Sequence, residues 1–426
     1  CLPTNYIHSD FLHIVTTTTS AALLPLRDNT ALDEPKGPIL FRDALTKKPI
    51  RICPSIQNPD NTLVVTPTGK GKTGFACAVA GRVTDHGETA IMVMPKNENR
   101  NTKNTKGTDY KTFCEKKGGE LVDFSNDDLI PGLLVIPFNT KLFGNKKWAY
   151  QISADNHYDY VEDIIGALTG RVLTPGMKNS QSKRLKQLYQ DRGILDAKGK
   201  VINIQDWGNP DKIKWPVYED IREMIWATRN PKTNIIPDAS DRALYEATAK
   251  TAPGMPYDRY VNSRKRIQPE KDLVVFDLSG LPTKNLSNAY SIYLMEYINL
   301  SYLPKDPDQP SKRTYVFWDE IHDLMENEVT APNLEKGARK GRAELVTSFF
   351  FTQDTVLPDD KFKTLKANCR NIILFCNLND TNVNDVMKAF NIDERYREGL
   401  KRQGYEIGYL LRDGFTRDVE LTLTKF

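Results

Sequence analysis

The stretch at residues 61–80 reads NTLVVTPTGKGKTGFACAVA, and it decides the fold. Its β-branched apolar start, residues 63–65, predicts a short buried strand, and its end, rich in alanine and other small apolar side chains, predicts a helix. Between them lies the loop TPTGKGKT, residues 66–73. A strand, a glycine loop ending in Lys-Thr and a helix form the arrangement that cradles phosphate groups, so this stretch predicts nucleotide binding.

The loop also predicts which residues hold the nucleotide. In this pattern Lys72 reaches the β- and γ-phosphates, and the Thr73 hydroxyl holds Mg²⁺. Thr66 stands where the pattern G-x-x-x-x-G-K-[ST] has its first glycine, so the loop leaves its strand without that glycine's conformational freedom. The alternative is a fortuitous surface turn rich in glycine and lysine. The other predicted nucleotide-binding residues are Thr68, Gly69, Lys70, Gly71 and Gly74.

The composition of the 426 residues is that of an ordinary soluble protein, with 27% charged and 39% apolar residues. A net charge of +4 argues neither for nor against a nucleic-acid partner. No apolar run approaches the roughly 18 residues of a spanning helix, and no signal peptide is present. The chain opens on Cys1 rather than Met, so we expect a fragment, and a targeting or membrane-docking segment could precede it. The six cysteines lack a C-x-x-C pair, which favours scattered buried thiols in a reducing compartment over zinc or disulfides.

Strands and helices alternate through most of the chain, which predicts a parallel α/β sheet. We expect helices at residues 110–117 and 286–300, the second amphipathic, and a surface loop at residues 97–108. Residues 405–411 and 419–424 are expected to pair at the sheet edge, and residues 38–41 and 49–52 to pack on the edge of the sheet. The remaining strands are expected at residues 89–94, 118–124, 272–278, 313–318, 347–351 and 371–376.

A mainly helical block interrupts this alternation between residues 148 and 268. Asp238 and Ser240 are credible N-caps within it. Because sheet-type strands resume afterwards, we interpret residues 148–268 as a lobe inserted into one nucleotide-binding domain, whose two parts are residues 1–147 and 269–426. Its basic clusters are interpreted as a solvated face, with a nucleic-acid groove as the alternative. The clustered residues are Lys183, Arg184, Lys186, Arg259, Arg264, Lys265 and Arg266.

The second predicted site is Asp319-Glu320, at the end of the apolar strand 313–318. In phosphate-loop enzymes the aspartate at such a strand end orders Mg²⁺ and its waters, and the following glutamate takes a proton from the attacking water. Asp319 is therefore the predicted magnesium ligand and Glu320 the predicted general base. The alternative is an ordinary strand followed by an acidic helix start. His322, just beyond, is expected to be a helix-surface or core residue rather than a ligand.

Three further residues are predicted to act on the γ-phosphate. Gln353, after the strand 347–351, is a candidate to sense it or to position the attacking water; the alternative is a polar strand cap. Arg339 and Arg342 are candidates for the arginine that a neighbouring subunit supplies. Their alternative is a solvated basic helix end or a phosphate contact to nucleic acid.

Taken together, these residues resemble the motor half of the large conjugation ATPases of type IV secretion systems, the TraC/VirB4 class, within the RecA-like motors that include HerA and FtsK translocases. The family usually reads Asp-Glu-Ala-Trp where this chain has Asp319-Glu320-Ile321-His322. Thr66 and Met94-Pro95-Lys96, where Asp-Pro is common, are the other departures. The remaining segments that carry the resemblance are residues 2–3 with 17–26, 37–41, 118–122 with 136–139, 275–281, 339–340 and 352–353.

The resemblance implies a RecA-like P-loop NTPase core with an inserted all-helical lobe, which uses ATP and Mg²⁺ and turns ATP and water into ADP and phosphate. It implies a homo-oligomeric ring, typically a hexamer, that works with other secretion-channel subunits in the cytoplasm at the inner face of the bacterial cell membrane. Membrane contact would come only through missing regions or partners. The predicted function is an ATPase that powers assembly of, or transport through, a conjugative channel. The alternatives are a DNA-translocating coupling protein or HerA-like translocase, acting on DNA or a protein–DNA substrate, and a nucleotide-binding scaffold without turnover.

Overall fold

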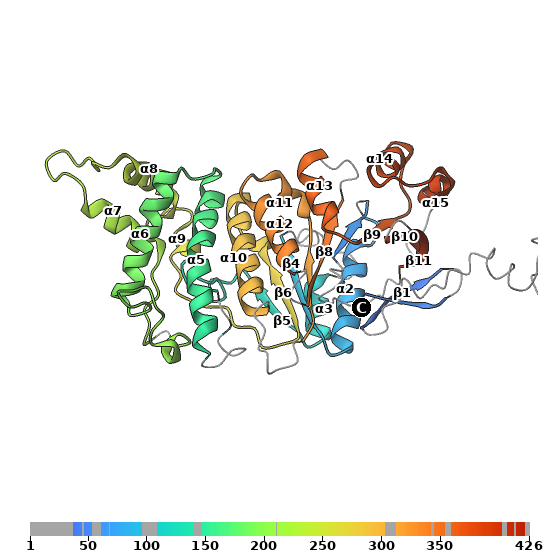
Figure 1. Ribbon diagram of the computed structural model, residues 1–426, viewed down its shortest axis with the longest axis horizontal. Helices are drawn as coiled ribbons and strands as arrows, with labels where there is room; N and C mark the ends of the chain where they lie inside the picture. The colour runs from blue at the N-terminus through green and yellow to red at the C-terminus, as the bar shows by residue number, and fades with distance from the viewer. Residues whose placement is uncertain are drawn as a thin grey trace, which may run out of the picture.

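The computed structural model describes thirteen stretches of the chain (Figure 1). Thr68, Arg342, the expected loop at 97–108 and the first 36 residues lie outside them. The described residues are 37–44, 47–52, 61–67, 69–95, 109–137, 139, 146–209, 211–302, 312–341, 345–353, 359–402, 407–412 and 415–421.

The strands of the described residues form one sheet in the order β2-β1-β11-β10-β9-β3-β8-β7-β4-β6-β5. The seven strands from β9 to β5 run parallel to one another, and β10, β11, β1 and β2 pair antiparallel. This confirms the predicted α/β fold with a mainly parallel sheet. The strands are β1 (Ile39–Asp43), β2 (Pro49–Arg51), β3 (Thr62–Val65), β4 (Thr89–Met94), β5 (Glu120–Asp123), β6 (Leu273–Asp277), β7 (Thr314–Trp318), β8 (Val346–Thr352), β9 (Asn371–Phe375), β10 (Ile407–Arg412) and β11 (Phe415–Glu420).

The expected place of the last two strands is wrong. β10 and β11 do form an antiparallel pair, but β11 also pairs with β1, with Arg42 opposite Glu420. β1 in turn pairs with β2, which is the edge strand. The sequence indicated each hairpin separately but carried no signal for their pairing with each other.

Helices cover both faces of the sheet, and local sequence explains where several of them begin. Thr174 caps α6 by accepting a hydrogen bond from the Met177 amide at 3.3 Å, with Pro175 as the first helical residue. Asp238 caps α8, as expected, whereas Ser240 lies inside the helix. The helices are α2 (Lys72–Asp85), α3 (Tyr110–Lys116), α5 (Lys147–Thr169), α6 (Pro175–Asp191), α7 (Tyr218–Ala227), α8 (Ala239–Ala247), α9 (Asp258–Val261), α10 (Lys284–Tyr302), α11 (Ile321–Glu326), α12 (Thr330–Gly341), α13 (Asp359–Ala367), α14 (Asp380–Phe390) and α15 (Arg397–Lys401).

Helix α10 forms where the sequence predicted an amphipathic helix, and most of its side chains are buried. Tyr290, Tyr293 and Tyr297 are all fully buried. Figure 1 shows the reason, because α10 lies between the sheet and α5, and Tyr297 contacts Phe276 of β6 with ring centroids 6.0 Å apart. Polar side chains in the middle of α10, such as Asn288 and Glu296, are therefore buried, whereas Lys284 at its start is exposed.

The helices α5 to α9 share a hydrophobic core with one face of the sheet. Val316 of β7, Tyr293 of α10, Ile164 of α5 and Leu185 of α6 belong to one continuous cluster. Alternate strand residues, such as Phe317, form a second cluster with α2 and α3 on the other face. Among the described residues between β5 and β6, strand pairing is limited to a single bridge between Leu195 and Val201. The inserted lobe at 148–268, and the domain division around it, stays a prediction.

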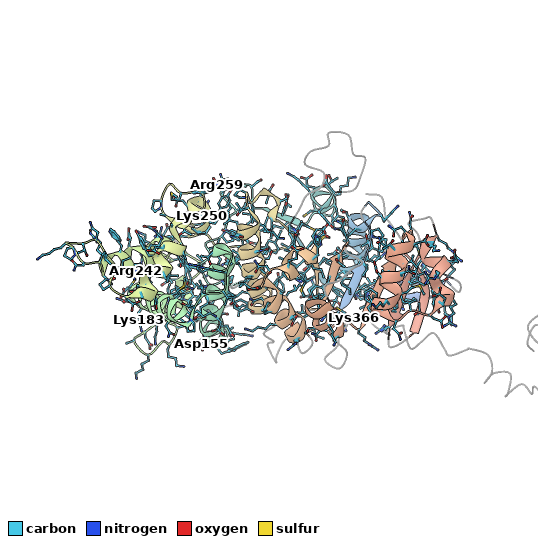
Figure 2. All side chains as sticks on the ribbon, turned by 90° about the horizontal axis from the view of Figure 1, so that it is seen from above. Asp155, Lys183, Arg242, Lys250, Arg259 and Lys366 are labelled. Carbon is cyan, nitrogen blue, oxygen red and sulfur yellow. The ribbon has the colours of Figure 1, made fainter. Side chains whose placement is uncertain are left out.

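The two basic clusters do not form one surface. We call residues 146–209 and 211–268 the helical segment. Figure 2 places Lys183 and Arg259 on opposite sides of it. Arg184 pairs with Asp241 at 2.5 Å, and all three guanidinium nitrogens of Arg266 are buried. The predicted solvated face is therefore wrong for Arg266, which packs among aromatic rings instead of facing water.

Two expectations from the composition, on the cysteines and on membrane-spanning helices, can be compared with the described residues. Cys77, Cys114, Cys369 and Cys376 are buried thiols, as expected, and the other two cysteines lie outside the described residues. Each helix in the described part of the chain is too short or too polar to cross a bilayer.

Candidate nucleotide-binding site

The predicted site residues follow three neighbouring parallel strands. The glycine loop follows β3, Gln353 follows β8, and Asp319 and Glu320 follow β7. In the sheet, β8 lies between β3 and β7, with Val65 opposite Thr352 and Trp318 opposite Phe350. Because the carboxyl ends of parallel strands meet at the same edge of a sheet, residues far apart in sequence converge there.

The backbone of the loop explains both its glycines and its missing glycine. Gly69 and Gly71 have φ angles of +72° and +89°, in the region that other residues rarely adopt. Thr66 is not among the described residues with positive φ; its amide donates to the Thr352 carbonyl at 3.0 Å, and its side chain is fully buried. Thr66 therefore follows β3 while still hydrogen-bonded to β8, and this position does not require glycine.

The N-terminus of α2 faces the loop without a competing anion. Gly71 is the N-cap, no side chain caps the helix, and its first turn, which includes Gly74, carries no acidic residue. The free N–H groups of a helix start and its dipole favour an anion at this place. No side-chain anion of the described residues therefore competes with phosphate at the start of α2. Lys70 lies in the turn just before this helix.

Lys72 lies between the two predicted acids. Its Nζ is 2.9 Å from Asp319 Oδ1 and also contacts Glu320 Oε1. All three side chains are almost fully buried, with relative exposures of 8%, 5% and 2% for Lys72, Asp319 and Glu320. Burial alone would lower the pKa of Lys72, but the two carboxylates together raise it above its ordinary value. The ammonium and the carboxylates therefore compensate one another's charge.

Glu320 has an unusual backbone and several partners. Its φ of +48° is left-handed, a conformation that a non-glycine residue holds only when its surroundings enforce it. Its Oε1 accepts a hydrogen bond from the Gln353 amide, as well as the contact from Lys72. His322 Nδ1 lies 3.2 Å from its other oxygen, Oε2. Gln353 thus joins the cluster, and His322 contacts the predicted base, although we expected it only as a surface or core residue.

Tyr110 is a site residue that the sequence did not reveal. It is the first residue of α3, and its hydroxyl donates to Asp319 Oδ2 at 3.2 Å and lies beside the Thr73 side chain. Nothing in the local pattern around Tyr110 distinguishes it from an ordinary helix-start tyrosine. The only available signal was its place after the carboxyl end of β4, which neighbours β7.

The donor set around this hydroxyl fits a magnesium ion. Thr73 contributes a hydroxyl oxygen and Asp319 a carboxylate, and hard oxygen ligands of this kind suit Mg²⁺. Asp319 accepts from the Tyr110 hydroxyl and Thr73 lies beside that hydroxyl, so both side chains are at one place. Their roles as magnesium ligands stay a prediction that this geometry supports.

The predicted arginines do not join the cluster. Arg339 lies on α12 with its side chain 61% exposed and 3.9 Å from Glu335, one helical turn earlier. Arg342 lies outside the described residues. An arginine that acts on a neighbouring subunit would be expected to face outward, so the position of Arg339 leaves its predicted role open.

The sheet, the flanking helices and the loop at the carboxyl end of β3 define the class: the chain has an α/β RecA-like P-loop NTPase fold. The structure of VirB4 of Thermoanaerobacter pseudethanolicus matches 92% of this chain and 98% of that chain, with a TM-score of 0.69 and 14% sequence identity. The bacterial conjugative coupling protein TrwBdeltaN70 matches 93% of this chain and 92% of its own, with a TM-score of 0.50 and 14% identity. No protein-family model and no curated protein sequence matches the chain. The resemblance to the VirB4 class, inferred from motifs, is thus confirmed in the fold.

Proposed function

We propose that this chain is a motor ATPase that powers assembly of, or transport through, a conjugative type IV secretion channel. The observation that carries the proposal is the buried cluster of Lys72, Asp319, Glu320 and Gln353 at the carboxyl ends of β3, β7 and β8. The similarity of the fold to VirB4 over almost the whole of both chains supports the choice of machine.

The cluster suggests how each residue works. Lys72 exchanges its carboxylate partners for the β- and γ-phosphates of ATP, which carry more negative charge. Glu320, released from Lys72, then takes the proton of the attacking water, and Gln353 holds the carboxylate and the water in line. Thr73 and Asp319 hold the magnesium ion, which supplies charge neutralisation on the phosphates when it is bound.

The assembly is part of the proposal. Phosphoryl transfer gains from an arginine on the γ-phosphate, and Arg339 or Arg342 of a neighbouring subunit would supply it in a homo-oligomeric ring, which we propose to be a hexamer. The ring would work in the cytoplasm, at the inner face of the bacterial cell membrane. It would reach the membrane through regions beyond this chain or through other channel subunits.

Steady-state ATP hydrolysis over a range of protein concentrations tests the proposal. Lys72→Ala should lower kcat by about 10³-fold or more, and Glu320→Gln by about 10²- to 10⁴-fold with ATP binding retained. Lys250→Ala, a change on the surface of the helical segment (Figure 2), is the matched control and should hydrolyse ATP like the wild type. If Glu320→Gln matches a wild type that binds but does not turn over ATP, the chain is a nucleotide-binding scaffold instead.

A DNA-translocating coupling protein, or a HerA-like translocase, is the second candidate. The observation in its favour is the match to the coupling protein TrwBdeltaN70 over 93% of this chain. This function predicts that double-stranded DNA stimulates hydrolysis, and that the stimulation weakens steeply as salt rises. Hydrolysis that is indifferent to DNA at low salt would leave the secretion motor as the better assignment.

A further inference from the structure

The Tyr110 hydroxyl bridges the two residues proposed to hold magnesium. It donates to Asp319 Oδ2 at 3.2 Å and lies beside the Thr73 side chain. These contacts join α3 to the start of α2 and to the end of β7, three elements that are separate in sequence. The same oxygen therefore occupies the space that Thr73 and Asp319 both face.

Both oxygens of Asp319 already have protein donors. Its Oδ1 is 2.9 Å from Lys72 Nζ and accepts from the Glu320 amide at 3.0 Å. Among the described residues, its Oδ2 accepts from Tyr110 alone, and the residue is only 5% exposed. Each carboxylate oxygen has two lone pairs, so Oδ2 is the oxygen with room for a metal. A cation at Oδ2 therefore competes with the Tyr110 hydroxyl for space around that oxygen.

In this contact the Tyr110 hydroxyl is the donor and Asp319 Oδ2 is the acceptor. Removing the contact requires movement of the Tyr110 side chain.

Local structure allows the Tyr110 side chain to move away from Asp319. Tyr110 is the first residue of α3, and the helix start is secured by Asp109, whose carboxylate accepts from the Thr112 amide at 2.6 Å. A side chain at the first helical position can change its rotamer without breaking an intrahelical hydrogen bond. The ring is only partly buried against the apolar cluster around α2 and α3.

We propose that Tyr110 competes with magnesium, so that its hydroxyl must leave Asp319 and Thr73 before these residues bind the metal of Mg·ATP. The inference rests on the proposed function, because it assumes that Thr73 and Asp319 are the magnesium ligands. It makes Tyr110 a positioning residue that sets the magnesium dependence of nucleotide binding. The opposite role, a tyrosine that helps to hold the metal, predicts an effect of opposite sign.

The test is calorimetric titration of ATP into the wild type, Tyr110→Phe and Tyr396→Phe, each with excess Mg²⁺ and with EDTA. Tyr110→Phe removes one hydrogen bond that the metal must displace, so Mg·ATP should bind about three- to tenfold more tightly. ATP in EDTA should bind with unchanged affinity. Tyr396→Phe removes a hydroxyl that donates to the Thr416 carbonyl at 3.2 Å, far along the chain, and should change neither affinity.

Weaker or unchanged Mg·ATP binding by Tyr110→Phe overturns the inference. A wild type that binds no ATP under either condition overturns the proposed function instead, so the two failures are distinguishable. Tyr110→Met, which lacks the hydroxyl and the ring, is the second variant. It should also bind Mg·ATP more tightly than the wild type, and thermal unfolding of each variant shows that the comparison is between folded proteins.

Discussion

Two regions of the molecule bury charge in opposite ways. At the carboxyl edge of the sheet, Lys72 is buried against two carboxylates that compensate it. In the helical segment, Arg266 is buried with all three guanidinium nitrogens lacking a hydrogen-bond partner among the described residues. Its guanidinium lies over the Trp215 ring instead, 4.8 Å from the centroid. Burial lowers the pKa of Arg266 to about 10, whereas the carboxylates raise that of Lys72.

The difference indicates which of the two buried cations, Lys72 or Arg266, can exchange its partners for a ligand. In the proposed function, phosphate groups replace the carboxylates around Lys72, because both are anionic acceptors for the same ammonium. Aromatic faces hold the Arg266 cation only weakly and cannot be exchanged for another ligand in a packed core. The sheet edge is therefore suited to binding and release, and the helical segment to a static structure.

The largest expected effect on stability comes from Lys72→Met in the absence of nucleotide. Removal of the ammonium leaves two buried carboxylates uncompensated, so the free energy of unfolding should fall by about 3–5 kcal/mol in urea titrations. Lys117→Met is the matched control, because Lys117 pairs at 2.8 Å with Asp85, whose side chain is 67% exposed, and should cost less than about 1 kcal/mol. Equal losses of unfolding free energy in the two variants would mean that the buried ion pairs of Lys72 stabilise the fold no more than an exposed ion pair does.

The next effect concerns the buried pair that joins α5 of the helical segment to α10. His157 Nδ1 is 2.7 Å from Glu296 Oε1, and both side chains are fully buried. His157→Ala should cost about 3 kcal/mol in urea unfolding, because it creates a cavity and removes a partner of the carboxylate. ATP affinity should not change. His86→Ala, at a 46% exposed side chain, should be nearly neutral, and a loss of ATP affinity in His157→Ala would link the two regions.

Arg266→Met should have a smaller effect of opposite sign. The methionine keeps apolar contact with Trp215 and relieves the cost of an unpaired buried cation, so stability should rise by about 1–2 kcal/mol. Its control is Arg264→Met, which removes a hydrogen bond to the Trp215 carbonyl of 2.8 Å and should destabilise by about 1 kcal/mol. If both variants lose stability, the cation over the rings contributes more than its desolvation costs.

The smallest effect should appear at alkaline pH. The pKa of Lys72 is raised in the folded protein above its ordinary value of 10.5, so protonation of Lys72 stabilises the fold fully below that value. This contribution is lost as pH rises through the raised pKa. The difference in unfolding free energy between the wild type and Lys72→Met should therefore shrink above about pH 10.5. A difference that stays constant to about pH 12 would contradict the raised pKa.

The sequence predicted much of the site, because its parts are local motifs. The loop around Lys72 and the acids after β7 are short patterns with a known chemistry, and β4 lies at residues 89–94 as expected. Tyr110 and His322 carry no motif, since a tyrosine or histidine near a helix start is common. Their contacts with Asp319 and Glu320 depend on the order of the strands, which periodicity does not encode.

Burial was harder to predict than secondary structure. The sequence predicted α10 as an amphipathic helix, yet most of its residues are buried, because α5 and α12 pack against it. Arg266 belongs to a basic run and still lies inside. A side chain's exposure depends on what covers it, and that cover comes from residues distant in the chain.

By itself the sequence determined that strands alternate with helices and that a phosphate-type loop and a pair of acids each follow a strand. These follow from local rules: side-chain periodicity, glycine at positive φ and capping. Only the tertiary structure decided that β8 lies between β3 and β7, which brings Gln353 to Glu320 and Lys72 to both acids. It also decided that Tyr110 bridges Thr73 and Asp319, because long-range strand pairing sets which side chains share a space.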